Sequence, residues 1–572
     1  MEANPVIPFA CANWSSRGTC CKNEGKLSCG SCSLVVYCGK DCQKIHWPIH
    51  KTTCRSPLSK AGWRPAWDHE GRQPAWSKNA VSGQHNPFGG TKYLWGNTPA
   101  IDVLKLELNE GNSYEEDIAV LFAASGDLRN VIKTIADLPN DAKQRFEMAI
   151  NDREFEIVAR NAILLLFVLN APDVTNFSSD AESLIHLWYS SFLPANVLSQ
   201  LHTRVKPLIS TVCSQIADKA SGTVLRKTWH FRSGRTLRLV LRKEEWFKLE
   251  KICDVEEGLS CEQAAKTRAA ITLAPERADY RDRWLFKDAT SSMRIAKQLF
   301  REDGLLLPFG HPRIGFNTPN PTLFQASSSW SLDDKADPLA GWPIWQVHCT
   351  SVLAREDLYG KLFVYLCEVL ERFQQRLVTT RVDFEIYNVD VKELPKLLER
   401  GKYSRIEVAN ICDAGYVGIR GTLATLCPLL QSSLRNPHAT LITVFINAVM
   451  EMARGNDKDS IPNTDLLMEY LPTPDVRKLM WPQNADVLRL WDARTLVFSA
   501  DEYFERYMML QKFGQISTDL RVAAKEVNTI IDRWPMGLTL RPEQKGAKEE
   551  FNMLLSSNFS GAERYVEWKR NE

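Results

Sequence analysis

The sequence predicts an α/β main body, split in two by a helical insertion, with a small cysteine-rich segment before it and a helical C-terminal region after it. Three observations support this prediction. Eight of the 15 cysteines lie within residues 11–54. Short apolar strands alternate with helical segments at residues 93–205 and again at 376–456, whereas residues 206–375 and 457–572 read as mostly helical. At 572 residues, the chain is long enough for several domains.

Composition and charge narrow the class of protein. A hydrophobic fraction of 44% and a charged fraction of 24% are typical of a folded globular chain. The net charge of +2 gives no support for a nucleic-acid or membrane-surface binder. The start, MEANPVIPFACANW, lacks the features of a signal peptide, and the apolar run at 162–169 is far shorter than the ~20 residues that span a bilayer. We therefore expect an intracellular protein, cytoplasmic or nuclear, that contacts neither membrane nor nucleic acid.

The clustered cysteines indicate a metal site rather than disulfides. In a reducing compartment, clustered thiols bind metal, whereas scattered thiols are small buried side chains. Zinc prefers four thiolate or imidazole ligands in a tetrahedron. The candidate ligands are Cys11, Cys20 or Cys21, Cys29, Cys32, Cys38, Cys42, His50 and Cys54.

The spacing of these ligands predicts two interleaved zinc sites. His50 and Cys54 are four residues apart and share one face of a helix. Cys42 and His50 are about 12 Å apart along a helix axis, too far to bind one ion. We therefore predict one site with Cys29, Cys32, His50 and Cys54, and another with Cys11, Cys38, Cys42 and one of the cysteines at 20 and 21. Two closed four-ligand sites are typical of structural zinc.

The string YCGKDCQKIHWPIHKTTC resembles the second half of MYND-type zinc fingers, and the resemblance covers residues 11–54. It implies that His50 rather than His46 is the histidine ligand. It also implies Cys21 as the ligand in preference to Cys20, because the gap from Cys21 to Cys29 is common in the family. The front of the finger departs from the family, which usually begins Cys-x2-Cys. MYND fingers recognise short, often proline-containing peptides, so the resemblance implies a protein partner of that kind.

Residues 55–92 are predicted to be a linker. Trp63, Trp67 and Trp76 stand among proline and glycine residues without a regular period. Such tryptophans favour an extended segment pinned onto the neighbouring domain, with a peptide-binding stripe as the alternative.

The first half of the main body begins with a strand–helix–strand unit. We expect strands at Ile118–Ala123 and Phe146–Ile150, a helix at Leu128–Leu138 between them, and a second helix at 154–169. A small-residue turn before a helix lets a ligand approach the backbone, and a carboxylate after the next strand can accept ribose hydroxyls. Ser125, Gly126, Asp127 and Asp152 are therefore candidate contacts for a nucleoside such as S-adenosylmethionine. The alternative is a tight turn in which Asp127 caps the helix.

The segments YLWGNTPAIDVLKLELNEG, VLFAASGDLRNVIKTI and INDREFEIVARN resemble a domain of unknown function. That domain follows a MYND finger in fungal proteins and is related to the N-terminal domain of dynein axonemal assembly factors. It is similar to class I methyltransferases, so the resemblance implies a doubly wound sheet but no established reaction.

The second half of the body is expected to complete the same sheet. Apolar strands are predicted at Val382–Tyr387, Arg405–Ala409 and Ala439–Ile446. Because two buried parallel strands make too small a sheet, these segments should pair with the strand at 118–123. Asn410 and Asp413 would then face the crevice beside the turn at 124–127.

The sequence is consistent with two candidate functions. The favoured one is an interaction adaptor whose finger binds a partner and whose body is a scaffold without catalysis. The alternative is an S-adenosylmethionine-dependent methyltransferase whose finger recruits substrate. A zinc hydrolase is excluded, because the sequence has no His-Glu-x2-His string or open metal site.

Overall fold

The computed structural model describes most of the chain in twelve ranges. They are residues 7–14, 20–78, 87–111, 113–171, 177–287, 290–325, 329–453, 464–471, 481, 483–497, 500–557 and 561–571.

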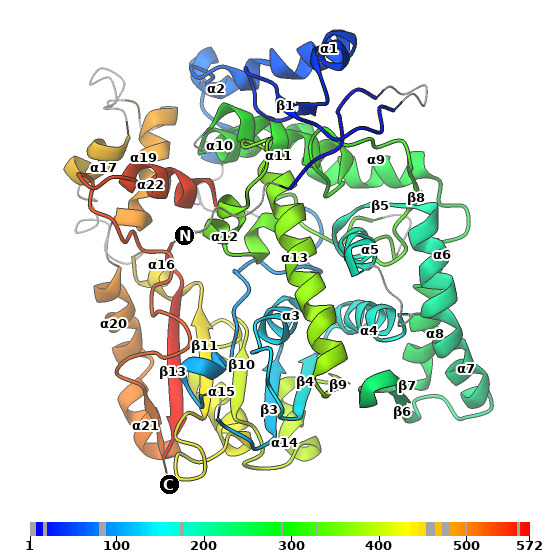
Figure 1. Ribbon diagram of the computed structural model, residues 1–572. Helices are drawn as coiled ribbons and strands as arrows, with labels where there is room; N and C mark the ends of the chain where they lie inside the picture. The colour runs from blue at the N-terminus through cyan, green and yellow to red at the C-terminus, as the bar shows by residue number, and fades with distance from the viewer. Residues whose placement is uncertain are drawn as a thin grey trace.

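A nine-stranded sheet runs through the main body in the order β12-β13-β11-β10-β3-β4-β9-β7-β6 (Figure 1). Its strands are β3 (Ile118–Ala123), β4 (Phe146–Asp152), β6 (Val224–His230), β7 (Thr236–Arg242), β9 (Val382–Asn388), β10 (Arg405–Val408), β11 (Thr440–Phe445), β12 (Val522–Ala524) and β13 (Arg564–Arg570).

Strands from the two predicted halves pair directly at the centre of this sheet. β3 is parallel to β10, with Val120 opposite Arg405, and β4 is parallel to β9, with Phe146 opposite Val382. Partners in the second pair are 236 positions apart, since 382 minus 146 is 236. The prediction that both halves form one sheet is confirmed, and the chain is a mixed α/β protein.

The apolar run of β3 is continuous because both faces of the sheet are covered. Ile118, Val120 and Phe122 enter one hydrophobic core, and the alternate residues enter the other. The first core includes helices α3 (Arg129–Ala136), α4 (Phe155–Leu169), α5 (Phe177–Tyr189) and α13 (Leu358–Thr379). The second includes α14 (Leu394–Leu397), α15 (Gly418–Leu426), α16 (Ala448–Ala453), α20 (Asp501–Leu510) and α21 (Phe513–Leu520).

The expectation that residues 206–375 and 457–572 are helical needs correction at both edges of the sheet. The antiparallel pair β6–β7 extends one edge from inside the insertion, and β13 and β12 extend the other. In β7, Leu237, Leu239 and Leu241 are buried and alternate with the half-buried Arg238 and Val240. In β13, charged residues are themselves buried. The sequence analysis predicted both regions to be mostly helical.

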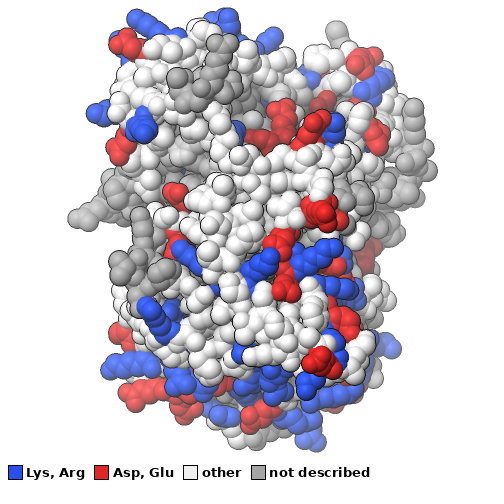
Figure 2. Space-filling view, turned by 90° about the vertical axis from the view of Figure 1, so that its right-hand side faces the viewer, with Lys and Arg blue, Asp and Glu red and all other residues white. Residues whose placement is uncertain are grey.

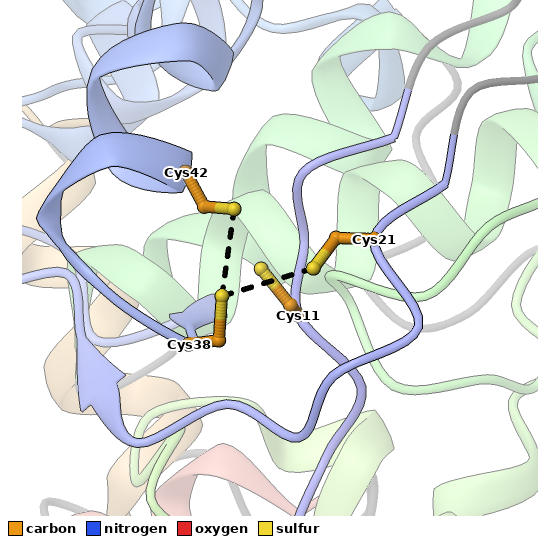
Figure 3. A group of neighbouring side chains, drawn as sticks. All are labelled: Cys11, Cys21, Cys38 and Cys42. Atoms are coloured by element: carbon orange, nitrogen blue, oxygen red, sulfur yellow. Dashed lines mark hydrogen bonds between the residues drawn. The ribbon is translucent and has the colours of Figure 1, made fainter.

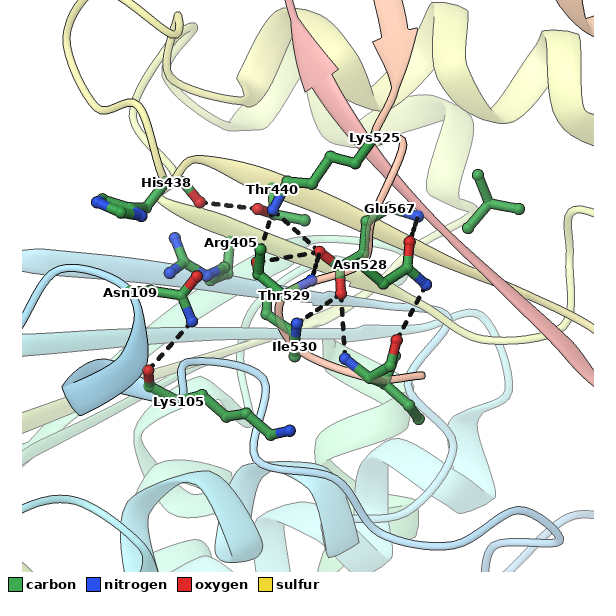
Figure 4. A network of polar contacts seen from close by, with 12 residues as sticks. Lys105, Asn109, Arg405, His438, Thr440, Lys525, Asn528, Thr529, Ile530 and Glu567 are labelled. Carbon is green, nitrogen blue, oxygen red and sulfur yellow. Dashed lines mark hydrogen bonds and ion pairs between the residues drawn. The ribbon is translucent and has the colours of Figure 1, made fainter. Parts of the chain in front are cut away.

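A buried polar network holds β13 in place (Figure 4). Glu567, fully buried, accepts hydrogen bonds from the backbone N–H of Thr529 at 2.9 Å and of Ile530 at 2.7 Å. The Nζ of Lys525 lies 2.9 Å from the same carboxylate. The charge is thus compensated inside the fold, which permits a glutamate in a central part of the molecule.

The remaining helices and a two-stranded sheet lie outside the large sheet (Figure 1). Before the insertion lie β5 (Phe192–Pro194) and α6 (Ala195–Arg204). The insertion contains β8 (Phe316–Pro319), α7 (Lys206–Ile216), α8 (Lys243–Lys251), α9 (Cys261–Thr272), α10 (Ala278–Lys287), α11 (Ser291–Asp303) and α12 (Ile344–Cys349). The C-terminal region contains α17 (Thr464–Tyr470), α19 (Ala485–Val497) and α22 (Ala547–Ser556). No helix in the described ranges combines the length and the apolar character needed to cross a membrane.

The predicted linker is pinned onto α10 by its tryptophans. It contains the short helix α2 (Ala66–Glu70). Trp67 and Trp76 are buried and pack edge to face with ring centroids 5.0 Å apart, and Trp76 contacts Tyr280 of α10. Asp279 of α10 accepts hydrogen bonds from the backbone N–H of Ala75 and from the guanidinium of Arg72. The packing role predicted for these tryptophans is confirmed.

Candidate zinc centres

The N-terminal finger brings its potential ligands together with two short strands and one helix. Strands β1 (Leu27–Ser28) and β2 (Val36–Tyr37) pair antiparallel, and the turn between them contains Cys29 and Cys32. Helix α1 (Lys40–Cys54) follows directly and contains the last three predicted ligands, Cys42, His50 and Cys54.

The first group consists of Cys11, Cys21, Cys38 and Cys42, whose sulfurs converge in Figure 3. The Sγ atoms of Cys21 and Cys38 are 3.7 Å apart, and those of Cys38 and Cys42 are 3.4 Å apart. Zinc–sulfur bonds of about 2.3 Å in a tetrahedron place sulfurs about 3.8 Å apart. The separations therefore fit four thiolates around one zinc ion. Cys20, next to Cys21, is exposed and outside the group.

The second group consists of Cys29, Cys32, His50 and Cys54, all of them buried. The Sγ atoms of Cys29 and Cys54 are 3.9 Å apart, and the Sγ of Cys32 lies 3.5 Å from Nε2 of His50. Each group holds four soft or borderline donors within 4.8 Å of one another, which is the donor set that zinc prefers. The structure thus groups the eight side chains as the sequence analysis did.

Electrostatics within the second group favour a cation at its centre. The hydrogen bonds from Cys32 and His50 lower the pKa of Cys29 to about 3. The pKa of Cys32 changes in the opposite direction, because its hydrogen bond with Cys29 and its burial both raise it. Without a cation only part of this cluster can ionise. A divalent metal would allow all three cysteines to be thiolates together.

His46 has a different role from His50, although both lie on α1. Its Nδ1 lies 3.0 Å from the hydroxyl of Tyr37, and its ring stacks on that of His50 with centroids 6.1 Å apart. His46 is buried but belongs to neither group of potential ligands. Its contacts are those of a residue that orients the helix against β2.

The finger is fixed to the insertion by backbone contacts as well as by packing. The Nε1 of Trp14 donates to the carbonyl of Gly310 at 2.9 Å, and the Oγ of Ser292 on α11 donates to the carbonyl of Cys32 at 2.8 Å. A side chain at Gly310 would have its Cβ 3.1 Å from the Cβ of Ala12. The ligand loops are therefore in tight contact with the main body.

The candidate nucleoside turn lies at the carboxyl end of β3. Asp127 is buried, lies 2.5 Å from a guanidinium nitrogen of Arg129, and accepts a hydrogen bond from the N–H of Gly96 at 2.8 Å. Ser125 is also buried, and its hydroxyl donates to the carbonyl of Gly126 at 3.3 Å. Asp127 also accepts the backbone N–H of Arg129, the first residue of α3, at 3.5 Å, so its carboxylate is used at the start of the helix and in holding the preceding segment.

Asp152 is directed at the same turn. Its two carboxylate oxygens accept hydrogen bonds from the N–H of Gly126 at 3.1 Å and of Glu154 at 2.9 Å. Burial raises the pKa of Asp152, although these two bonds oppose the shift. A Cβ at Gly126 would have no neighbour within 4 Å, so the space in front of this glycine is open.

Asn410 and Asp413 were predicted to face the crevice beside the turn at 124–127. Asp413 is fully buried and accepts hydrogen bonds from the N–H of Ile446 and Asn447, so it ties β10 to the end of β11. The expectation that it faces an open crevice is therefore wrong. Sequence reasoning missed Glu407 of β10, which is 6% exposed and has an Oε2 without a hydrogen-bond partner among the described residues. A charged residue in an apolar strand is the signal that could have identified it.

Two closed four-ligand groups in one short segment define a structural zinc finger. Residues 18–54 match the family described as the MYND finger, and residues 94–193 match one described as a domain of unknown function, DUF4470. The finger is thus a MYND zinc finger. The second match contains only β3 and β4 of the nine-stranded sheet.

Curated relatives match the finger region only. N-lysine methyltransferase SMYD2-B of Xenopus laevis is 44% identical over 46 residues, which is 8% of this chain and 11% of the relative. The human N-lysine methyltransferase SMYD2 is 43% identical over 47 residues, with the same shares of 8% and 11%. The chain thus spans about a tenth of the length of these relatives. No solved structure matches it.

Proposed function

We propose that this protein is an interaction adaptor in which a zinc-stabilised finger binds a partner segment and the α/β body is a scaffold without catalysis. The observation that carries the proposal is the pair of closed donor groups, Cys11, Cys21, Cys38 and Cys42 with Cys29, Cys32, His50 and Cys54. Four protein ligands per zinc leave no position for water, so the metal would stabilise the finger rather than react.

A hollow on α1 supports a peptide partner. It measures about 340 Å³ and is lined by Lys40, Gln43, Lys44 and Trp47. The guanidinium of Arg55, which directly follows α1, lies 5.3 Å from the centre of the Trp47 ring in a cation–π contact. The Trp47 ring beside the amide of Gln43 and two lysines suits a short proline-containing segment. Proline packs on aromatic rings, and a proline-rich peptide loses little conformational entropy when it binds.

Peptide binding can be tested with the zinc-loaded full chain and fluorescent proline-rich peptides. We expect Trp47→Ala to weaken binding at least about tenfold, the effect of losing an aromatic anchor. Ile45→Ala is the matched control, because Ile45 is an exposed apolar side chain of the same helix outside the hollow. Both variants should retain their zinc. Equal affinity of the two variants would contradict a peptide site at Trp47.

The alternative function is an S-adenosylmethionine-dependent methyltransferase, and the strand order favours it. Counted along the chain, β3, β4, β9, β10 and β11 lie in the spatial order 3-2-1-4-5, which is the order of a doubly wound sheet, and β7 is a further parallel strand beside β9. Ligands of such sheets bind where the order reverses, here between β3 and β10. Ala124 in that turn has a φ of 51°, a strained value for a residue with a side chain.

The proposal of a scaffold without catalysis is supported by the internal hydrogen bonds that the candidate nucleoside-binding carboxylates already make. Asp127 is committed to Arg129 and Gly96, and Asp152 to two backbone amides. A calorimetric titration with S-adenosylmethionine separates the two functions. Binding that Asp152→Ala weakens by roughly 1–3 kcal/mol would support the enzyme. If no binding is detected at millimolar S-adenosylmethionine, the enzyme function is refuted and the scaffold function stands.

Several finer predictions stay as proposals beside this function. We place the protein in the cytoplasm or nucleus and keep the domain limits 11–54, 55–92, 93–205, 206–375, 376–456 and 457–572. Fungal origin and the relation to dynein axonemal assembly factors rest on sequence resemblance alone.

A further inference from the structure

A second hollow lies at the opposite end of the sheet from the candidate nucleoside turn. It measures about 480 Å³ and opens beside the C-terminal end of β13, near the mark for the C-terminus in Figure 1. Segments that precede β10, β11 and β12 meet the end of antiparallel β13 there. They place Arg400, Arg435, Arg521 and Arg570 around one cavity.

No carboxylate neutralises these arginines inside the hollow. None of its lining residues is acidic. Arg570 is half-buried and donates through Nη1 to the carbonyl of Leu430 at 3.0 Å, and Arg435 donates to the carbonyl of Gly401 at 3.3 Å. These acceptors orient the guanidinium groups without cancelling their charge. Arg400 and Arg521 are exposed, and neither makes an ion pair within the described ranges.

The nearest acidic side chain along the chain from Arg521 is already paired. Asp519 contacts Arg420 at 2.7 Å. Four like charges around one hollow create a positive potential that favours the binding of an anion. Arg521 in addition has a φ of 53°, a backbone conformation rarely adopted by residues with a side chain.

We propose that this four-arginine hollow binds a small molecule that carries several phosphate groups. Arginine binds phosphate through paired N–H donors, and the hydroxyl of Ser432 and the amide of Asn571 add neutral donors to the lining. The volume lies within the roughly 300–1,000 Å³ typical of small-molecule sites. The cations surround one hollow instead of forming a stripe, which favours a compact ligand over a nucleic acid.

The test is a calorimetric titration of the zinc-loaded full chain with inositol hexakisphosphate at physiological salt. We expect saturable binding of one molecule per chain. Arg400→Ala/Arg521→Ala should weaken it about tenfold or more, because two charged contacts are lost. Arg400→Lys/Arg521→Lys should weaken it less, since charge is retained but paired donation is lost. Neutral myo-inositol should not bind.

The matched control is Arg226→Ala/Arg242→Ala, which removes two exposed arginines from β6 and β7 at the other edge of the sheet. This variant should bind as the parent does. Equal weakening by both alanine pairs, or no saturable binding at millimolar ligand, would overturn the proposal. Vesicles that contain phosphatidylinositol bisphosphate identify the source: competition with the soluble probe indicates a lipid headgroup, and no competition indicates a free phosphate compound.

Discussion

At the scale of single residues, the two histidines of α1 have different neighbours. Nε2 of His50 lies beside Cys32, whereas Nδ1 of His46 faces the hydroxyl of Tyr37. We expect His50→Ala to reduce the zinc content from two ions per chain towards one, because one closed site loses a ligand. His46→Ala should retain both ions. Elemental analysis of metal-replete protein checks this, and equal loss from the two variants would refute the assignment.

Glu407 gives the stability of the protein a defined dependence on pH. Burial raises its pKa from 4.5 to about 7, although the Arg129 charge opposes this shift. A pKa that is higher in the folded state means that its contribution to stability is complete below pH 4.5 and is lost as the pH rises through 7.

We therefore expect Glu407→Gln to be more stable than the parent at pH 8, by on the order of 3 kcal/mol. The difference should shrink towards zero near pH 4.5. Urea unfolding of both proteins across this pH range provides the measurement. A glutamine variant that is no more stable than the parent at pH 8 would show that the carboxyl group is not desolvated.

At the scale of elements, the charged strand β13, next to the edge strand β12, depends on one buried carboxylate. Glu567 accepts bonds from the N–H of Thr529, Ile530 and Ile531 and contacts Lys525, so it attaches the segment after β12 to β13 (Figure 4). Losing this acceptor would leave several buried donors unpaired.

Glu567→Ala should lower the free energy of unfolding by at least about 3 kcal/mol, since each unpaired buried donor costs roughly 1–3 kcal/mol. The amides of residues 529–531 should also exchange faster with solvent. Glu526→Ala is the control, because Glu526 is exposed in the same segment. Similar destabilisation by both variants would mean that the network contributes no specific stability.

At the scale of the whole molecule, the sheet depends on segments that are distant in the sequence. β3 and β4 are held between β10 and β9, which belong to the second half of the chain. Their apolar side chains contribute to cores on both faces. Among the described residues of the range 93–205, β3 and β4 pair only with each other.

A fragment ending near residue 205 should therefore fail to form a stable body beyond its zinc finger. It would expose two unpaired strand edges and large apolar faces, which lead to aggregation. Size-exclusion chromatography and thermal unfolding of the fragment test this expectation. A monomeric fragment that unfolds cooperatively would contradict it, and the full chain serves as the folded control.

The strands that the sequence predicted correctly are those whose pattern is contained in a few neighbouring residues. Strand β3 agrees with its predicted limits, and β4, β9, β10 and β11 agree within two residues. β3 and β11 are near-continuous apolar runs between two covered faces, and the other three strands keep apolar residues at alternate positions. Strands β6, β7, β12 and β13, at or next to the two edges of the sheet, were missed. Their charged residues resemble a solvated helix, and only the contacts of Glu567 and the buried leucines of β7 reveal strands.

The sequence by itself determined the grouping of the finger's eight side chains and the strands at the centre of the sheet. Ligand spacing and apolar runs are properties of neighbouring residues, and helix or strand geometry converts them directly into positions in space. The tertiary structure alone decided that Asp127 and Asp413 are committed to internal contacts, and that four arginines from separate segments share one hollow. The arginines of the hollow are up to 170 positions apart, from Arg400 to Arg570, and no local period in the sequence encodes such contacts.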